Sequence, residues 1–337
     1  NATGGVITTY TYDALGRKTG ETAPDGSTIS YEYDLQGRLT KKTVGNNVPE
    51  TYTYDVFDNL ISKQRDGESI SYTYNAVGAR TSMTDSTGTT NYAYDPFGNL
   101  TTEAKNGIVK SYTYDVLGNR TSFNAANGEN SVIGNTYAYD NMGRLTSVTN
   151  GADTVSYTYD ANSNRLSTAL NGTVTNTATY NKGNLPVEIK NFDGGTLVDT
   201  TAFAYYFDGN VRNQVVTTAN DSTSTNYRYD GVGRLTKERT YSESDTFDYT
   251  NEYFYDNYGN RRIFMQTDDQ NNTITNVDYT FDSKNKLITS DFRRHNKTDS
   301  SLDKRVISNY AYDDFGNTVS VTENDELAKT YTYDAFN

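Results

Sequence analysis

The sequence predicts an all-β protein made of repeated antiparallel β-hairpins, coiled into a spiral sheet or a large hollow barrel-like shell. Three observations lead to this prediction. A short motif such as "YTYDALG" returns at intervals of 20 to 31 residues along the whole 337-residue chain. Within the motif, tyrosines alternate with other residues, which is the period of a β-strand. Residues typical of tight turns follow each copy.

The repeat is aligned on an aromatic anchor followed by Asp or Asn, which occurs fifteen times. The anchors are Tyr12, Tyr33, Tyr54, Tyr74, Tyr94, Tyr114, Tyr139, Tyr159, Tyr180, Phe207, Tyr229, Tyr255, Phe281, Tyr312 and Tyr333. A second Tyr precedes the anchor by two positions in every copy except the one with Ala178, and the two columns hold 27 of the 31 tyrosines. This spacing places both rings on one face of a strand, whereas a helix would place them on nearly opposite faces. We therefore expect ladders of tyrosine rings stacked from strand to strand.

The segment after each anchor predicts a type I turn closed by a one-residue bulge. In "YDALGR", Asp13 is the first turn position and Gly16 the fourth. The Asp side chain accepts backbone N–H groups, and Gly adopts the left-handed conformation that closes the turn. Asp58 and Ser163 occupy the glycine position in two copies and fit this pattern less well.

A second strand follows each turn and ends in a second turn signal. Examples of that signal are Asp66-Gly67, Asn106-Gly107 and Asn171-Gly172, which are strong hairpin signals. Each unit is therefore two strands and two turns, and fifteen units predict about thirty strands. Since open twisted sheets rarely exceed about ten strands without curling, we expect the ribbon to coil.

We expect one repeat array over residues 1–337, without separate domains. The repeats are regular over 1–160, irregular over 161–225 and longer over 230–312. In the irregular part, Ala178 interrupts the tyrosine column, and "NKG" at 181–183 and "DGN" at 208–210 are interpreted as shortened turns. Both ends stop inside a repeat, so we expect the chain to be a piece of a longer protein.

The amino-acid composition excludes several classes of function. The mean hydropathy of −0.80 and the net charge of −13 would permit disorder, but the aromatic content of 13% argues against it. The acidic balance disfavours nucleic acid and anionic membranes as partners. No apolar run is long enough for a membrane-spanning helix. Cysteine is absent, which excludes disulfides, thiolate metal sites and a cysteine nucleophile.

The motif copies "YTYDALGRKT", "YEYDLQGRLT", "YAYDPFGNLT" and "YRYDGVGRLT" resemble the tyrosine-aspartate (YD) repeats of RHS-repeat proteins. That family includes bacterial polymorphic toxins, wall-associated proteins, Tc-toxin C components and the teneurins. The resemblance covers essentially the whole chain. It implies a YD-repeat β-solenoid that closes into a hollow shell, which encloses a toxin or belongs to an adhesion ectodomain. It also implies a secreted or cell-surface bacterial location and a link to carbohydrate binding.

Three groups of residues are candidates for a site of chemistry. The single histidine, His295, lies among basic residues that would suit an acidic partner or a sugar: Arg293, Arg294, Lys297, Lys304 and Arg305. A solvated hairpin tip explains this charge run better. The run "DANSNR" from Asp160 to Arg165 matches the start of a calcium loop, but lacks its glycine and its final Glu.

The third group consists of the repeated side chains, which are the turn aspartates and the tyrosine ladders. Paired acid–base catalysis needs two carboxylates in unlike environments, whereas a repeat supplies equivalent ones. Tyrosine faces could stack on sugars, but we expect them to pack between strands in so polar a chain. We therefore predict no catalytic, cofactor-binding or metal site, and no cofactor.

The leading functional hypothesis is a non-enzymatic wall of a β-shell that encloses or displays another, covalently linked part of its protein, such as a toxin. The alternative is an adhesion module that binds carbohydrate or a cell surface. A third possibility, an enzyme that uses His295, predicts that an alanine at this position abolishes activity.

Overall fold

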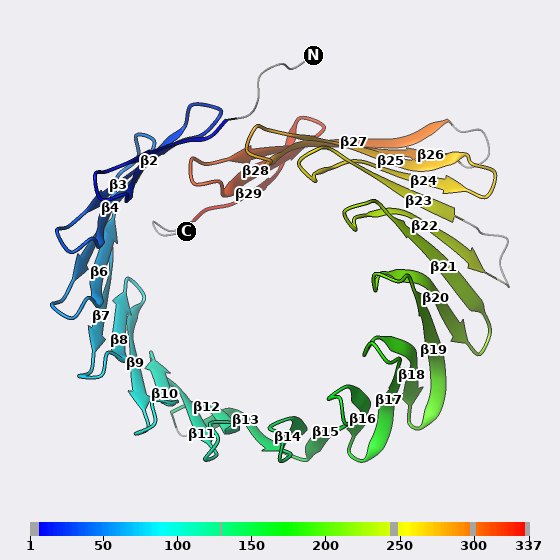
Figure 1. The fold of residues 1–337 in the computed structure, drawn as a ribbon, viewed down its shortest axis with the longest axis horizontal. Helices are drawn as coiled ribbons and strands as arrows, with labels where there is room; N and C mark the ends of the chain where they lie inside the picture. Colours follow the sequence, from blue (N-terminus) through cyan, green and yellow to red (C-terminus); the bar gives the residue numbers. More distant parts are fainter. Residues whose placement is uncertain (1–6, 129, 243–248, 297–300, 334–337) are drawn as a thin grey trace. The chain divides into compact units, whose positions relative to one another are not determined.

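A computed structural model describes residues 7–128, 130–242, 249–296 and 301–333, and in these residues the chain forms 29 β-strands and no helix (Figure 1). This confirms the predicted all-β class, and the number of strands is close to the expected thirty. No helix long and apolar enough to cross a membrane is present among the described residues. The described pairings join consecutive strands and are antiparallel, as a chain of hairpins requires.

The first twelve strands are β1 Thr9–Tyr12, β2 Lys18–Thr22, β3 Thr28–Tyr33, β4 Leu39–Val44, β5 Glu50–Tyr54, β6 Leu60–Arg65, β7 Glu68–Tyr74, β8 Arg80–Asp85, β9 Gly88–Tyr94, β10 Leu100–Lys105, β11 Ile108–Tyr114 and β12 Arg120–Asn127. The others are β13 Asn130–Tyr139, β14 Leu145–Asn150, β15 Asp153–Tyr159, β16 Arg165–Leu170, β17 Thr173–Tyr180, β18 Pro186–Asp193, β19 Thr196–Tyr205, β20 Val211–Thr218, β21 Ser222–Tyr229, β22 Leu235–Ser242, β23 Tyr249–Tyr255, β24 Arg261–Asp268, β25 Thr273–Phe281, β26 Leu287–His295, β27 Leu302–Tyr312, β28 Thr318–Glu323 and β29 Glu326–Thr330.

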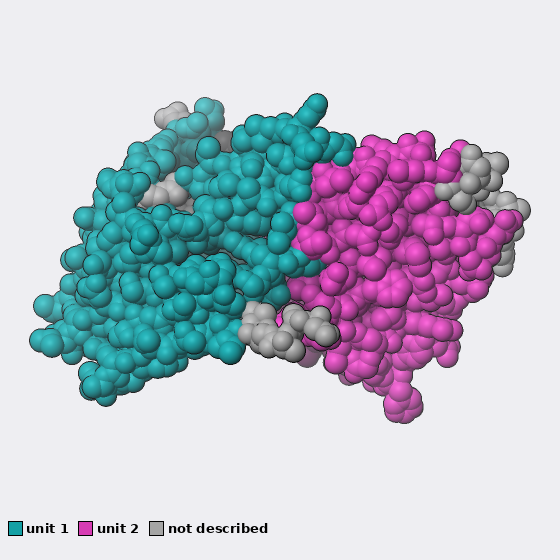
Figure 2. All heavy atoms as spheres, turned by 90° about the horizontal axis from the view of Figure 1, so that it is seen from above, with its two compact units in different colours: residues 1–133, 281–288, 309–337 teal, residues 134–280, 289–308 magenta. Residues whose placement is uncertain are grey.

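The chain divides into two compact units, coloured separately in Figure 2. Unit 1 comprises residues 1–133, 281–288 and 309–337, and unit 2 comprises residues 134–280 and 289–308. The long repeats predicted over 230–312 arise from longer strands, since β25, β26 and β27 have 9, 9 and 11 residues. The short repeats have shorter strands, as in β7 and β8 with 7 and 6 residues.

The hairpin β11–β12 represents the repeating unit. Tyr112 lies opposite Phe123 and Thr113 opposite Ser122, and the register then shifts so that Tyr114 lies opposite Arg120. The N–H of Gly118 donates to the carbonyl of Asp115 at 3.1 Å, and Gly118 has a φ of 83°. The predicted type I turn with a bulge is confirmed, and the anchor tyrosine stands at the bulge.

The fourth turn residue has the left-handed backbone conformation even in copies where it is not glycine. Asp58, Ser163 and Asn285 have φ values of 68°, 69° and 62°, so the two residues that fit the pattern less well adopt the same turn. A residue with a Cβ carries a conformational cost of roughly 1–2 kcal/mol in this region, less for Asn and Asp. Turn formation therefore outweighs local preference at these positions.

Two predictions for the irregular part were wrong. In "NKGN" the N–H of Asn184 donates to the carbonyl of Asn181, and Asn184 takes the left-handed position with a φ of 60°. The turn is thus full length. In the other turn Gly209 donates to the carbonyl of Tyr206, so Tyr206 is its first residue and Tyr205, not Phe207, is the anchor. Phe207 points to solvent at the tip of the turn, fully exposed.

The sheet has little conventional core. In β11 the two tyrosines are half-buried and Thr113 between them is exposed, so the tyrosine columns occupy the more covered face. Among the described residues no large side chain is less than 2% exposed, and the buried apolar residues are Ala169, Ala178, Ile274 and Val277. Because little apolar surface is buried, hydrogen bonds and ion pairs between neighbouring hairpins must contribute much of the stability of the fold.

Candidate functional site

The aspartate of each repeat holds its own turn. In Asp115, Oδ1 accepts the N–H groups of Leu117 and Asn119 at 2.9 Å each, and Oδ2 accepts the side-chain amide of Asn119 at 2.9 Å. The hydrogen bond from the Asn119 side-chain amide is the main cause of the lowered pKa of Asp115. Hydrogen bonds from the residue four positions later likewise lower the pKa values of Asp13, Asp55, Asp95, Asp140, Asp160 and Asp230.

Where that later residue is arginine, it also ties the turn to the next hairpin. The Nε of Arg38 donates to Oδ2 of Asp34 at 2.7 Å, and its Nη1 donates to the carbonyl of Asp55 at 2.8 Å. Its guanidinium lies 4.9 Å from the ring centroid of Tyr54, in cation–π contact. The same arrangement recurs at Arg17, Arg144 and Arg234.

In eleven described copies the anchor tyrosine joins its hairpin to the one before it. The hydroxyl of Tyr114 donates to the carbonyl of Leu100 in the preceding hairpin at 2.8 Å. The same bond is made by Tyr33, Tyr54, Tyr74, Tyr94, Tyr159, Tyr180, Tyr205, Tyr255, Tyr312 and Tyr333. We call this tyrosine with the following aspartate the YD node. A phenylalanine would lack the bond, which explains why the anchor column is almost wholly tyrosine.

The other tyrosine column differs from the predicted ladder of stacked rings. The Arg80 guanidinium lies 5.8 Å from the ring centroid of Tyr72 and 4.8 Å from that of Tyr92, and therefore separates the two rings. Lys18 does the same between Tyr10 and Tyr31, at 5.5 and 4.8 Å. Direct ring contact occurs within hairpins, for example between Tyr112 and Phe123, whose centroids are 5.4 Å apart. Basic side chains thus interleave between the rings.

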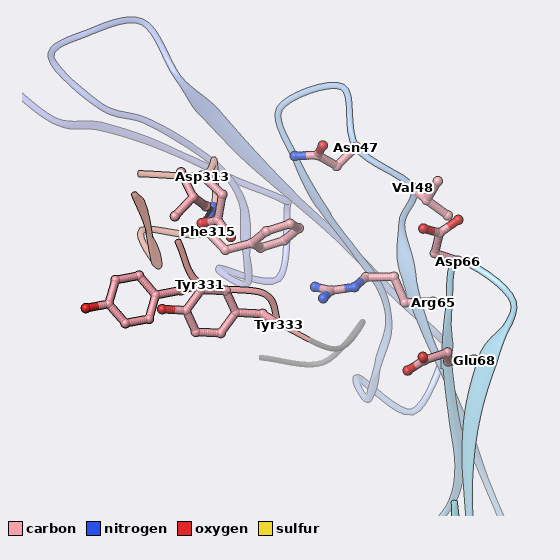
Figure 3. Close-up of a pocket in the computed structure, with 10 residues that line it drawn as sticks. Asn47, Val48, Arg65, Asp66, Glu68, Asp313, Phe315, Tyr331 and Tyr333 are labelled. Atoms are coloured by element: carbon pink, nitrogen blue, oxygen red, sulfur yellow. Dashed lines mark hydrogen bonds between the residues drawn. The ribbon is translucent and has the colours of Figure 1, made fainter. Parts of the chain in front are cut away.

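Unit 1 contains a pocket of about 460 Å³ between segments far apart in the sequence. Figure 3 shows Tyr331 and Tyr333 beside Phe315 on one side and Arg65 on the other. The guanidinium of Arg65 lies 4.3 Å from the Phe315 ring centroid. Nearby, the amide of Asn47 donates to Asp314 at 2.9 Å. The repeat pattern alone could not have identified these pairs, because the residues are some 250 positions apart.

Unit 2 contains a basic groove of about 380 Å³, and no motif in the sequence predicts it. Four cations line it, together with several tyrosines: Arg212, Arg228, Lys237 and Arg239. Arg228 lies opposite Lys237 across β21 and β22, and Arg239 lies 5.0 Å from the ring centroid of Tyr241. Lys237 forms an ion pair with Glu252 at 3.0 Å. The groove therefore gathers four basic side chains within a chain of net charge −13.

Comparison with known proteins identifies the repeat. The family model for the teneurin YD-shell matches residues 5–133 and 111–298, which together span most of the chain. The chain belongs to this family. The YD-shell is a structural shell domain, and the chain is accordingly a structural shell module. No curated protein sequence matches it.

Solved structures agree with this YD-shell fold. The crystal structure of TcdB2-TccC3-Cdc42 is similar, with a TM-score of 0.55, 14% identity, and coverage of 97% of this chain and 19% of that chain. The Photorhabdus luminescens Tc holotoxin pore is similar, with a TM-score of 0.56, 14% identity, and coverage of 94% and 21%. The YD-shell described here spans about a fifth of those chains.

The basic run around His295 is largely neutralised in the YD-shell. Arg293 forms ion pairs with Asp278 at 2.8 Å and with Asp291, and Arg305 also binds Asp291, at 2.7 Å. Arg294 pairs with Asp303 at 2.7 Å. Lys297 lies outside the described residues. The structure therefore places these arginines in a cross-strand ion-pair network, and not in a free basic patch.

The calcium-like run at Asp160 is an ordinary YD-shell turn. Oδ1 of Asp160 accepts the N–H groups of Asn162 and Asn164, at 2.9 and 2.8 Å, and Oδ2 accepts the Asn164 amide at 2.8 Å. The carboxylate is thus engaged by its own turn. Within the described ranges, no three His, Cys, Asp or Glu residues are grouped as a metal site would require.

Proposed function

We propose that this chain is a wall segment of a secreted or cell-surface bacterial shell, which encloses or displays another part of the same protein, such as a toxin. The observation that carries the proposal is the YD node, which joins one hairpin to the next along the array. Such repetition builds an extended wall from small polar units with little core. The Tc toxin names of the similar structures support a linked toxin as the enclosed part. We further propose that residues 1–337 act as one array without catalytic activity of its own.

Protease protection tests this function in the full-length protein that contains the chain. We expect the linked part to resist digestion in the intact protein and to be digested when it is produced alone. Replacing Tyr54, Tyr114 and Tyr159 by Phe removes three hydroxyl bonds between hairpins and should speed digestion. Equal digestion of the linked part with and without the shell would contradict enclosure.

The basic groove of unit 2 favours a second candidate function, the binding of an acidic carbohydrate. Guanidinium groups bind carboxylates through paired hydrogen bonds, and tyrosine faces stack on sugar rings. A glycan array with this chain should then give saturable binding to carboxylated glycans, reduced about tenfold or more by Arg228→Ala. Arg65→Ala, in the other unit, is the matched control. Absence of binding, or equal loss in the control, would argue against this candidate.

A further inference from the structure

Two turns near the C-terminal end of unit 1 lie against turns of its N-terminal hairpins. Lys284, in the turn between β25 and β26, forms an ion pair with Asp25 at 2.9 Å and also donates a hydrogen bond to Ser27. In the turn between β27 and β28, Oδ2 of Asp314 accepts the side-chain amide of Asn47 at 2.9 Å. We call this contact the seam of unit 1, and it comprises residues 23–27, 44–47, 65, 282–286 and 313–316.

The seam covers a residue that other copies of the turn leave exposed. Phe315 is the third residue of its turn, as are Phe57 and Phe97, and the three turns have the same hydrogen bonds to their aspartates. Phe57 and Phe97 are 82% and 90% exposed, whereas Phe315 is only 39% exposed. The Arg65 guanidinium lies 4.3 Å from its ring centroid (Figure 3). Contact across the seam therefore contributes to this difference.

The seam differs in kind from the joints between consecutive hairpins. Consecutive hairpins share a ladder of backbone hydrogen bonds, as β8 and β9 do. Among the described strand pairings, none joins β1–β6 to β28 or β29. Side chains make the three contacts of the seam, which are an ion pair, an amide–carboxylate hydrogen bond and a cation–π contact. Contacts of these kinds between partly exposed groups are individually weak.

Two cavities lie along the seam. One of about 490 Å³ is lined by Pro24 and Val44 on one side and by Lys286 on the other. The pocket of about 460 Å³ lies between Arg65 and Phe315. Since closely packed protein interiors have few voids larger than a water molecule, the two sides of the seam are loosely packed. Separating them would therefore forfeit few van der Waals contacts.

We propose that the seam is a clasp that opens and closes while the hairpins of unit 1 stay folded. Lys284 is its central residue, because one ammonium group binds both Asp25 and Ser27. Opening breaks side-chain contacts and keeps every backbone ladder between consecutive hairpins, so the open form is a minor state of the folded chain. The use of this clasp as an exit for an enclosed part rests on the proposed function as a shell wall.

Distances between two spin labels test the clasp. The chain contains no cysteine, so labels can be attached to cysteines introduced at Val56 and Leu327, which are exposed and lie outside the seam. We expect a main population at shorter distance and a minor one at longer distance. Lys284→Glu should increase the longer population about fivefold or more, because repulsion from Asp25 replaces attraction. Adding Asp25→Lys to this variant should restore the shorter distance, since the pair is rebuilt with exchanged charges.

The matched control is Lys105→Glu. Lys105 forms an ion pair with Asp85 at 3.1 Å, and its side chain is 28% exposed, as is that of Lys284. The hairpins that this pair joins are also held by the ladders between β8, β9 and β10. The control should therefore leave the label distances unchanged. Far-ultraviolet circular dichroism should be the same for all variants, because no strand is lost.

Three results would overturn the proposal: unchanged label distances in Lys284→Glu, no restoration by the second substitution, or an equal change in the control. Loss of the strand signal in Lys284→Glu would also overturn it, because the seam would then be needed for folding. The proposed enclosure stands or falls separately. Equal digestion of a linked part with and without the shell contradicts enclosure and does not bear on label distances, whereas a seam that stays closed contradicts only the clasp.

Discussion

Replacing Tyr114 by Ala is expected to lower the free energy of unfolding of unit 1 by about 3 kcal/mol. The change removes a half-buried ring and the hydroxyl that donates to the carbonyl of Leu100. Tyr114→Phe keeps the ring and should cost about 1 kcal/mol, the usual net value of one hydrogen bond. Urea unfolding followed by tyrosine fluorescence measures both changes.

Tyr12 is the matched control for the hydroxyl. It stands in the same column, is 60% exposed, and its hydroxyl makes no hydrogen bond to any described residue. Tyr12→Phe should therefore change the unfolding free energy by less than about 0.5 kcal/mol. If Tyr114→Phe were as mild as Tyr12→Phe, the bond between hairpins would not contribute to stability.

Acid is expected to destabilise the chain progressively between about pH 4 and pH 2. Folding lowers the pKa of turn aspartates such as Asp115, chiefly through the Asn119 side-chain hydrogen bond, and the pKa of Asp85 falls to about 2 through Thr87 and Lys105. A pKa below its unfolded value means that the unfolded state binds more protons. The stabilisation is therefore present above the unfolded pKa of 3.8 and is lost as the pH falls through the folded pKa.

Urea midpoints measured at neutral pH and at several acidic pH values test this expectation. Asp115→Asn should reduce the acid sensitivity, because an amide oxygen can accept the same N–H groups without titrating. Asn75 already does so, accepting the N–H groups of Val77 and Ala79 at 3.1 and 2.9 Å. A urea midpoint that stays constant from neutral pH to about pH 2 would contradict the role assigned to the aspartates.

The hairpins and their turns could be predicted because their determinants are local. Asp115 and Gly118 are three residues apart, and the bonds that close the turn stay within five residues. The wrong assignment of Phe207 as an anchor also arises because only local residues were compared. Its "FDGN" resembles an anchor and turn, but Tyr205 pairs with Val211, which places the anchor two residues earlier.

The contacts between hairpins were harder to predict. Arg80 separates two tyrosine rings, while Leu100 occupies the corresponding position in the next repeat. The change between Arg and Leu at this position is visible in the sequence, but its consequence depends on which side chains face one another across the sheet. The basic groove of unit 2 was missed for the same reason, because Arg212, Arg228 and Arg239 come from three different strands.

The sequence by itself determined the class of fold, the repeating unit and the role of aspartate and glycine in each turn, since these depend on bonds between near neighbours. Only the tertiary structure decided that the tyrosine hydroxyl joins consecutive hairpins and that cations lie between rings. It alone brought Asn47 to Asp314 and Lys284 to Asp25, each across more than 250 residues. Such contacts depend on backbone twist accumulated over many hairpins, and no local pattern specifies that sum.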